Sequence, residues 1–200
     1  MSRIRVALIV AILVAAASRA DAGPLHDAAA EGDLGAVETL LRAGNDADAT
    51  GANQETPLMA AALADQPGIA VVLVAAGADV MARNQGGLTP LHAAAYGGSV
   101  EVAALLLDKG AVLEDRENVS GATPFMLAAE QGQLAVAELL IERGADIGLP
   151  DREGFTPLSQ AWAKQRTDMV RLLKAHGAVC QSAEMLGSED FHRRCVAAGT

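Results

Sequence analysis

Five stretches of the chain repeat one another at a nearly constant spacing, and this period limits the possible folds more than any other feature. Proline and glycine markers recur in one register, at steps of 33, 33, 34 and 33 residues. The prolines are Pro24, Pro57, Pro90, Pro124 and Pro157, and the closing glycines are Gly44, Gly77, Gly110, Gly144 and Gly177. Such a period predicts a solenoid in which one supersecondary unit is stacked on the next.

Each repeat has the pattern of two short helices. In four repeats a Thr-Pro pair predicts a helix start, because threonine caps the helix and proline fits its first position. An alanine-rich segment follows, and Gly32, Gly98 and Gly132 predict its end in repeats one, three and four. Apolar residues at helical spacing then predict a second helix, as in residues 100–107. A Gly-Ala pair ends that helix and begins an extended turn.

The segments TPLHAAAYGGSVEVAALLLDKGA from Thr89 and TPFMLAAEQGQLAVAELLIERGA from Thr123 share a TPLH-like start, a central glycine, paired apolar residues and a closing Gly-Ala. In these features residues 23–179 resemble the ankyrin repeat family. The resemblance implies an all-α solenoid of five helix–turn–helix repeats joined by short β-hairpin loops. The repeats would start near residues 23, 56, 89, 123 and 156. The second helix of repeat five carries charged residues on one side, which is typical of a terminal repeat facing water.

The first 22 residues have the pattern of a cleaved signal peptide. Arg3 and Arg5 precede an uncharged apolar run over residues 6–17, and small residues around Ala20 and Ala22 fit two cleavage sites. The run is too short to cross a bilayer as a helix, which takes about 20 residues. We therefore expect export, cleavage after Ala20 or Ala22, and a mature chain that is not inserted in the membrane. The expected compartment is the periplasm, with the extracellular medium as the alternative.

The charge of the chain limits its partners. The formal net charge is −10, and the basic residues are scattered rather than clustered. This balance disfavours nucleic acid as a partner and adhesion to an anionic membrane. An acidic chain favours instead a protein partner with a basic patch, because complementary charges speed encounter.

The sequence contains no motif that predicts an enzyme. Hydrolase, zinc-protease, phosphate-binding and dinucleotide motifs are missing. His26 and His92 occupy the fourth position of the helix starts, where other repeats have methionine or serine, so a structural role is expected for both. We therefore expect a monomeric protein-binding module that has no catalytic activity and takes no cofactor.

The family resemblance also implies where a partner binds. In ankyrin repeats, partners dock on the loop tips and on the first helices, at positions that flank the helix start or end the first helix. Carried over onto this chain, these positions are Asn53, Glu55, Leu63, Arg83, Gln85, Leu88, Tyr96, Glu117, Ser120, Glu130, Gln131, Arg152, Glu153, Phe155 and Lys164. Leu88, Tyr96 and Phe155 are the expected anchors, because large side chains dominate interface energies. The alternative is that Leu88 and Phe155 only cover their own loops.

Residues 180–200 follow the last repeat and contain both cysteines of the chain. Cys180 and Cys195 fit a disulfide, because an even pair of cysteines joins in the oxidising space that a signal peptide implies. The tail is expected to fold over the end of repeat five, with its apolar residues Met185, Leu186 and Phe191. The alternative is a small metal-binding or catalytic protein centred on the cysteines and His192, although three ligands do not complete a structural zinc site.

Overall fold

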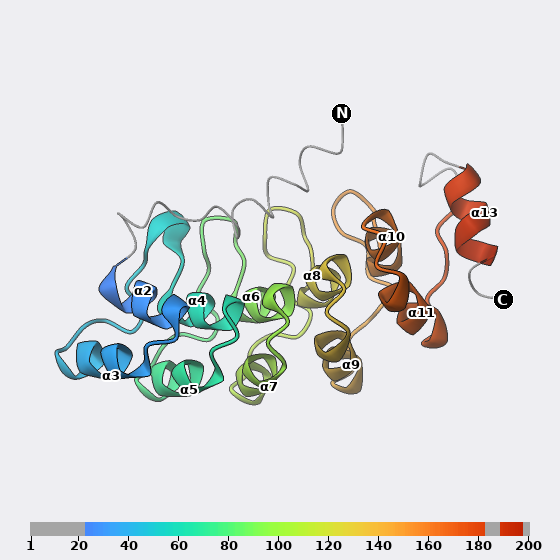
Figure 1. Ribbon diagram of the computed structural model, residues 1–200. Helices are drawn as coiled ribbons and strands as arrows, with labels where there is room; N and C mark the ends of the chain where they lie inside the picture. Colours follow the sequence, from blue (N-terminus) through green and yellow to red (C-terminus); the bar gives the residue numbers. More distant parts are fainter. Residues whose placement is uncertain (1–22, 183–188, 198–200) are drawn as a thin grey trace.

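The computed structural model describes residues 23–182 and 189–197 (Figure 1). The predicted signal peptide, residues 1–22, lies outside the described residues, and so do Met185 and Leu186 of the tail. Of Phe191 only the helical backbone is described. Signal cleavage and the packing of these three side chains therefore stay predictions.

Within the described residues, five pairs of helices are stacked along the chain, one pair for each repeat (Figure 1). The pairs are α2 (Pro24–Glu31) with α3 (Leu34–Arg42), α4 (Pro57–Leu63) with α5 (Pro67–Ala75), α6 (Pro90–Gly97) with α7 (Val100–Asp108), α8 (Pro124–Gln131) with α9 (Leu134–Glu142), and α10 (Pro157–Ala163) with α11 (Thr167–Ala175). First helices contact first helices and second helices contact second helices, in chain order. The predicted all-α solenoid of five repeats is confirmed.

Threonine begins the first helices as the sequence predicted. The Thr56 hydroxyl accepts a hydrogen bond from the N–H of Met59, and Thr123 and Thr156 cap α8 and α10 in the same way. Repeat one has Gly23 at this position, so α2 has no side-chain cap. The loss of such a cap costs about 1 kcal/mol, and α2 is therefore the least secured of the first helices.

The turn from first to second helix needs a left-handed backbone. Gly32, Gly98 and Gly132 provide it with φ of 81°, 87° and 78°, a conformation that glycine adopts without strain. In repeats two and five, Asp65 and Gln165 take the same conformation with φ of 53° and 58°. A residue with a Cβ pays about 1–2 kcal/mol for this backbone, so the fold imposes the turn even where the sequence does not favour it.

Two columns of equivalent residues form the centre of the core. The inner column is made of alanines, which let the first helices approach closely, and the outer column is made of leucines. The columns are Ala61, Ala94, Ala128 and Ala161, and Leu73, Leu106, Leu140 and Leu173, and none of these side chains has any exposed surface. Successive members are one repeat apart, so the period of the sequence is also the period of the packing.

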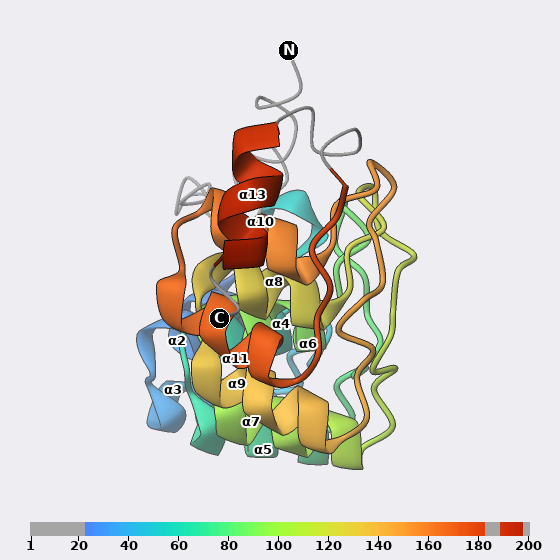
Figure 2. The ribbon, with the colours of Figure 1, turned by 90° about the vertical axis from the view of Figure 1, so that its right-hand side faces the viewer.

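The segments that connect the repeats form loops along one side of the helices (Figure 2). No β-strand occurs in residues 23–182 and 189–197. The loops are nevertheless closed like hairpins by backbone hydrogen bonds between residues four apart. These bonds run from the N–H groups of Gly51, Asn84 and Asp151 to the carbonyls of Glu55, Leu88 and Phe155. The predicted hairpins are therefore tight turns without paired strands.

The tail is joined to repeat five by the predicted disulfide. Cys180 and Cys195 are bonded across a separation of 15 residues, and Cys195 is buried. The helix α13 (Glu189–Ala197) lies beyond α10 and α11 at the end of the stack (Figure 1). The Gln181 side chain extends this attachment, because it accepts a hydrogen bond from the N–H of Thr156 at 3.4 Å and donates one to the Gly154 carbonyl.

Candidate functional site

The predicted binding residues lie in two rows. The loop row contains Asn53, Glu55, Arg83, Gln85, Leu88, Glu117, Ser120, Arg152, Glu153 and Phe155 on the loops between repeats. The helix-end row contains Leu63, Tyr96, Glu130, Gln131 and Lys164 at the C-terminal ends of the first helices. Both rows run parallel to the stack, so neighbouring members come from successive repeats.

Three of the four loops are held by an Asn or Asp side chain at the same position. The carboxamide oxygen of Asn84 accepts the N–H groups of Gly86 and Leu88, each at 2.9 Å. Asn118 and Asp151 hold their own loops in the same way. These oxygens replace water for buried backbone donors and fix the shape of the loop tips.

The first loop has no such residue and differs from the others. Gly51 stands at the position of Asn84, and the loop contains a short 3-10 turn, η1 (Ala52–Gln54). Asn53 and Gln54 both have positive φ, at 56° and 59°. The loop row is therefore regular over repeats three to five but not at its N-terminal end.

Backbone hydrogen bonds join each loop to the next. The N–H of Gln85 donates to the carbonyl of Asn53 at 2.7 Å, and the N–H of Arg152 donates to that of Ser120 at 2.9 Å. Between them, the N–H of Val119 donates to the carbonyl of Gly86 at 3.0 Å. Because the tips are connected in this way, the loop row is a continuous surface rather than a set of independent loops.

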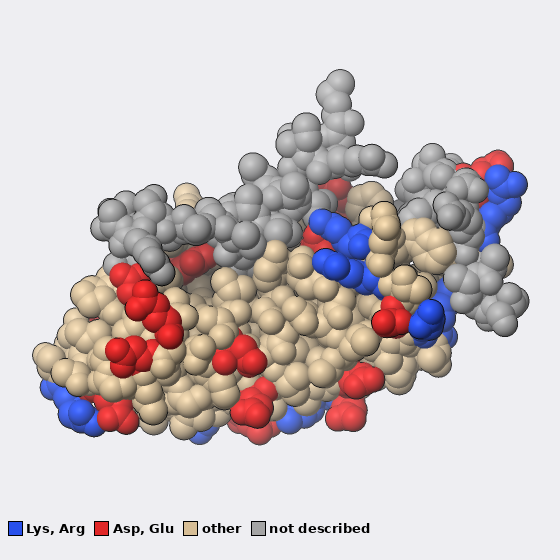
Figure 3. Space-filling view, in the orientation of Figure 1, with Lys and Arg blue, Asp and Glu red and all other residues tan. Residues whose placement is uncertain are grey.

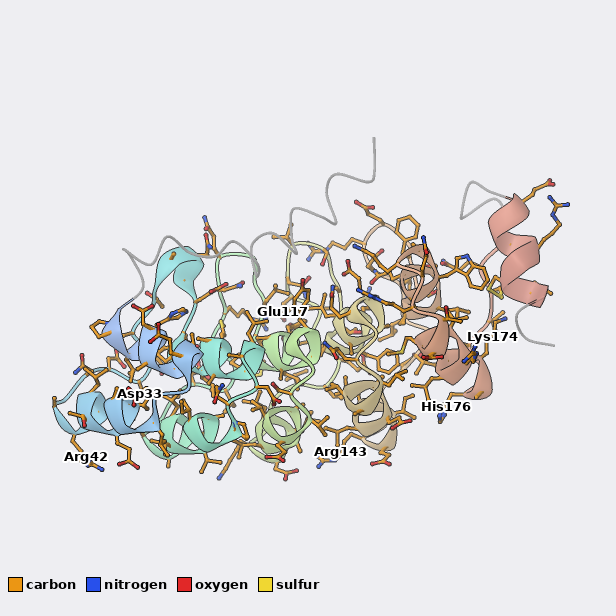
Figure 4. The ribbon with its side chains drawn as sticks, in the orientation of Figure 1. Asp33, Arg42, Glu117, Arg143, Lys174 and His176 are labelled. Atoms are coloured by element: carbon orange, nitrogen blue, oxygen red, sulfur yellow. A yellow bond between two sulfur atoms is a disulfide. The ribbon has the colours of Figure 1, made fainter. Side chains whose placement is uncertain are left out.

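Arginines reinforce these connections. Arg83 pairs with Asp115 of the next loop and lies 3.2 Å from the carboxylate of Glu117, which is labelled in Figure 4. The hydrogen bond to Asp115 raises the pKa of Arg83. Burial alone would raise the pKa of Asp115, but the hydrogen bond from Arg83, the interaction with His92 and the charge of Arg83 outweigh it and lower that pKa.

Arg116 has the same role one loop further on and was missed by the sequence analysis. It donates to the carbonyls of Gly121 and Pro150, so it joins the third loop to the fourth. Arg152 in turn donates to the Val119 carbonyl at 2.9 Å. Three successive loops have an arginine at a similar place, namely Arg83, Arg116 and Arg152. This recurrence in the sequence could have predicted the contact.

Two of the predicted binding residues are not accessible, and the structure corrects them. Leu88 is only 1% exposed and Glu130 only 2% exposed. Leu88 packs into the core beneath its own loop, as the alternative for this residue proposed. Glu130 is covered by Lys164, whose Nζ lies 2.8 Å from its carboxylate. Neither side chain can contact a partner unless the repeats open.

The remaining predicted residues reach the surface to different degrees. Gln85, Glu117, Arg152, Glu153 and Lys164 are exposed, while Asn53, Glu55, Leu63, Arg83, Tyr96, Ser120, Gln131 and Phe155 are half-buried. Half-buried residues suit anchoring, because part of the side chain is already fixed by the protein and less conformational entropy is lost on binding. Tyr96 and Phe155 are the large side chains in this group.

The helix-end row is held by a second set of contacts between repeats. Ser99 donates to the Ala62 carbonyl at 2.7 Å, and Gln133 donates to the Tyr96 carbonyl at 3.1 Å. Each donor precedes a second helix, and each acceptor is a carbonyl in the last turn of the preceding repeat's first helix. Such carbonyls have no partner within their own helix. The contacts therefore fix the helix ends and the side chains that they carry.

No group of three or more His, Cys, Asp or Glu side chains in the described part of the chain is arranged to hold a metal ion. Both cysteines are joined in the disulfide, which removes the thiolates that a zinc site in the tail would use. Among the helices described, none has the length and apolar content needed to span a membrane.

Comparison with known protein families agrees with this geometry. A family model described as ankyrin repeats (3 copies) matches residues 25–117 and 112–184. The chain belongs to the ankyrin repeat family. Ankyrin repeats are generally modules for binding other proteins, and proteins built from them are typically not enzymes. A comparison with curated proteins found no match.

Charge is unevenly distributed along the ankyrin repeats. Residues 23–88 contain nine Asp and Glu residues against two arginines, whereas residues 89–182 contain twelve against eight Lys and Arg residues. Figure 3 shows a group of acidic side chains over the N-terminal repeats, and a group of basic side chains beside α8 and α10 with some acidic side chains next to it. The acidity of the protein is therefore strongest at its N-terminal end.

We expect Asp151→Asn to leave the stability unchanged or to raise it by up to about 1 kcal/mol. Burial raises the pKa of Asp151 and outweighs its hydrogen bonds from Phe155, Glu153 and Gln160, so the ionised carboxylate is costly here. The amide keeps the oxygen that holds the loop, as in Asn84 and Asn118. Rotation of the Gln160 amide would also give a partner to its oxygen, which is buried without one.

Urea unfolding at pH 7 measures this prediction. Asp151→Ala is the control, since it removes the acceptor for two backbone N–H groups and should cost about 1–3 kcal/mol. A loss of more than 1 kcal/mol in Asp151→Asn would show that the charge itself is needed at this position.

Proposed function

We propose that this ankyrin-repeat protein is an exported, monomeric module that binds another protein in the periplasm and catalyses no reaction. The observation that supports binding is the pair of residue rows described above. Hydrogen bonds between repeats hold both rows, and half-buried Tyr96 and Phe155 stand in them as anchors. Preorganised side chains lose little entropy when a partner binds, which favours affinity.

Two features support the compartment. Residues 1–22 have the signal-peptide pattern, and the two cysteines are joined as they would be in an oxidising space. Mass spectrometry of protein isolated from the periplasmic fraction tests this part of the proposal. The expected mass corresponds to a chain that begins after Ala20 or Ala22 and gains two hydrogen atoms on reduction. Recovery of the uncleaved chain from the cytoplasm would contradict it.

The acidic N-terminal repeats support a partner with a basic patch. Opposite charges on the two proteins would raise the association rate and orient the encounter, and this contribution would weaken as salt is added. The extracellular medium is the alternative compartment, and the same charge argument holds there.

Affinity capture from a periplasmic extract tests binding. The wild-type protein should enrich a partner, and the double variant Tyr96→Ala, Phe155→Ala should lose it, because truncation of an interface anchor costs at least about 1 kcal/mol, or roughly fivefold in affinity. Val71→Ala is a matched control, since Val71 is an exposed apolar residue on the second helix α5. Capture of the same proteins by all three forms would argue against the proposal.

A further inference from the structure

Two cations from repeat five, Lys164 at the end of α10 and Arg166 just before α11, contact Glu130 at the end of α8, and Tyr96 stands near the equivalent end of α6. We call Tyr96, Glu130, Gln131, Lys164 and Arg166 the helix-end cluster. The Nζ atom of Lys164 lies 2.8 Å from the Glu130 carboxylate, and the Nε–H of Arg166 donates to the Glu130 carbonyl at 3.0 Å. Tyr96 of α6 lies in the field of all three charges. Burial raises its pKa, Glu130 adds to this effect, and Lys164 and Arg166 oppose it.

The charges of the helix-end cluster do not cancel. Glu130 is 2% exposed and neutralises Lys164, whose side chain is 41% exposed. Arg166 makes its hydrogen bond to a neutral carbonyl, and it forms no ion pair with any residue in the described part of the chain. The cluster therefore has one excess positive charge, carried by a guanidinium whose terminal nitrogens remain available as donors.

This excess contrasts with the rest of the molecule. The chain has a net charge of −10, and residues 23–88 carry only two arginines against nine Asp and Glu residues. In Figure 3 the basic side chains beside α8 and α10 stand apart from the acidic group at the other end of the stack. An acidic ligand would therefore be repelled from the N-terminal repeats and attracted to the C-terminal half of the helix-end row.

We propose that the helix-end cluster binds a carboxylate from an acidic segment of the protein partner, an inference that rests on the proposed binding function. Arg166 provides the planar pair of donors that carboxylates favour, and Tyr96 provides a half-buried aromatic surface near the end of α6 in the same row. A partner with a basic patch for the N-terminal repeats and an acidic segment for this cluster would bind in one direction along the stack.

The chain itself offers a conservative variant for the test. Gln133 stands one repeat before Arg166 and donates from its side chain to the Tyr96 carbonyl, as Arg166 does to the Glu130 carbonyl. Arg166→Gln should therefore keep the contact between repeats and remove the charge. Arg171→Gln is the matched control. It removes one positive charge from the exposed face of α11, where Arg171 pairs with Asp168 at 2.7 Å.

The experiment measures fluorescence anisotropy of a labelled hexaglutamate peptide with the whole mature protein at low salt. We expect saturable binding that is two- to fivefold weaker for Arg166→Gln, the range of a partly exposed ion pair, and unchanged for Arg171→Gln. A labelled hexalysine peptide should bind all three forms equally. Equal unfolding midpoints of the three forms would establish that the folds are intact.

Three results would overturn the inference. They are absence of hexaglutamate binding, equal weakening in both variants, and displacement of the peptide by inorganic phosphate at the same concentration as by free hexaglutamate. The last would indicate a general anion site instead of a site for a protein segment. Each result leaves the proposed binding function standing, since the capture experiment tests that function separately, through a partner that depends on Tyr96 and Phe155.

Discussion

Replacement of Gly97 by alanine is expected to destabilise the stack by about 2–3 kcal/mol, the upper part of the range for an overpacked site. Gly97 is the last residue of α6, and a Cβ atom built there would lie 2.4 Å from the carbonyl oxygen of Leu63 in the preceding repeat. That neighbour is backbone, so it cannot move aside as a flexible side chain could. Helices α4 and α6 would have to separate, and contacts in the alanine column between them would weaken.

Urea unfolding of Gly97→Ala beside Gly68→Ala tests this expectation. Gly68 lies in α5, and a Cβ atom added there would meet no other atom within 4 Å. Alanine at this position should therefore stabilise the protein by about 0.4–1 kcal/mol through helix propensity and a less flexible unfolded chain. The two changes are chemically identical and should have opposite signs. Stabilisation by both would mean that α4 and α6 are not closely packed in solution.

The sequence predicted the elements whose causes are local. Thr-Pro at a helix start and glycine at a left-handed turn act through bonds within one repeat, and the helices begin and end where these residues stand. The period then placed the Ala and Leu columns, because equivalent residues in a solenoid pack on one another. The family resemblance identified the two rows from position alone, and thirteen of the fifteen predicted residues are at least partly accessible.

Leu88, one of the two corrected residues, shows that its position in the repeat does not reveal whether a side chain is buried. The position before each Thr-Pro is occupied by Glu55, Leu88, Ala122 and Phe155, a variety that suggests a surface. In the structure the loop hydrogen bonds turn this position inward, so that Leu88 and Ala122 are 1% and 4% exposed. Variation there reflects how each loop fills the space beneath it, which depends on neighbours in the next repeat.

Contacts between loops were the least predictable part of the surface. Glu130 and Lys164 are one repeat apart and close to equivalent positions, so their ion pair follows from the period. Arg83 and Asp115 do not occupy equivalent positions in their repeats, so their ion pair depends on how one loop packs against the next. The close approach at Gly97 was also not predictable from the period, since the other repeats have Glu31, Ala64, Gln131 and Lys164 at the same position and tolerate a Cβ there.

The stability of the protein is expected to rise between about pH 4 and pH 6.5, and His92 should account for about 3 kcal/mol of the rise. His92 is fully buried between repeats three and four. Its Nδ1 accepts the N–H of Thr89 at 3.2 Å, which places the ring proton on Nε2, 3.1 Å from the Ala122 carbonyl. Burial lowers its pKa to about 4 despite the opposing effects of that carbonyl and of Asp115.

The sign follows from the difference between the two states. In the unfolded chain the histidine pKa is about 6.5, so between pH 4 and 6.5 the unfolded state binds more protons than the folded state. The free energy of unfolding therefore increases with pH across this interval. The stabilising contribution of His92 is fully present above the interval and is lost below it. Glu114 and Asp151, whose pKa values are raised mainly by burial, contribute in the opposite direction.

His92→Met isolates the histidine contribution, because those carboxylates are unchanged in the variant and cancel in the comparison. Methionine occupies the same position in repeats two and four, where Met126 accepts the N–H of Thr123 through its sulfur at 3.4 Å. The variant should be less stable than the wild type at pH 7, since it loses the hydrogen bond to Ala122. Between pH 4 and 6.5 its unfolding free energy should lack the rise of about 3 kcal/mol. An equal slope in both proteins would mean that His92 is protonated in the folded state, and that the contact between repeats three and four is open to water.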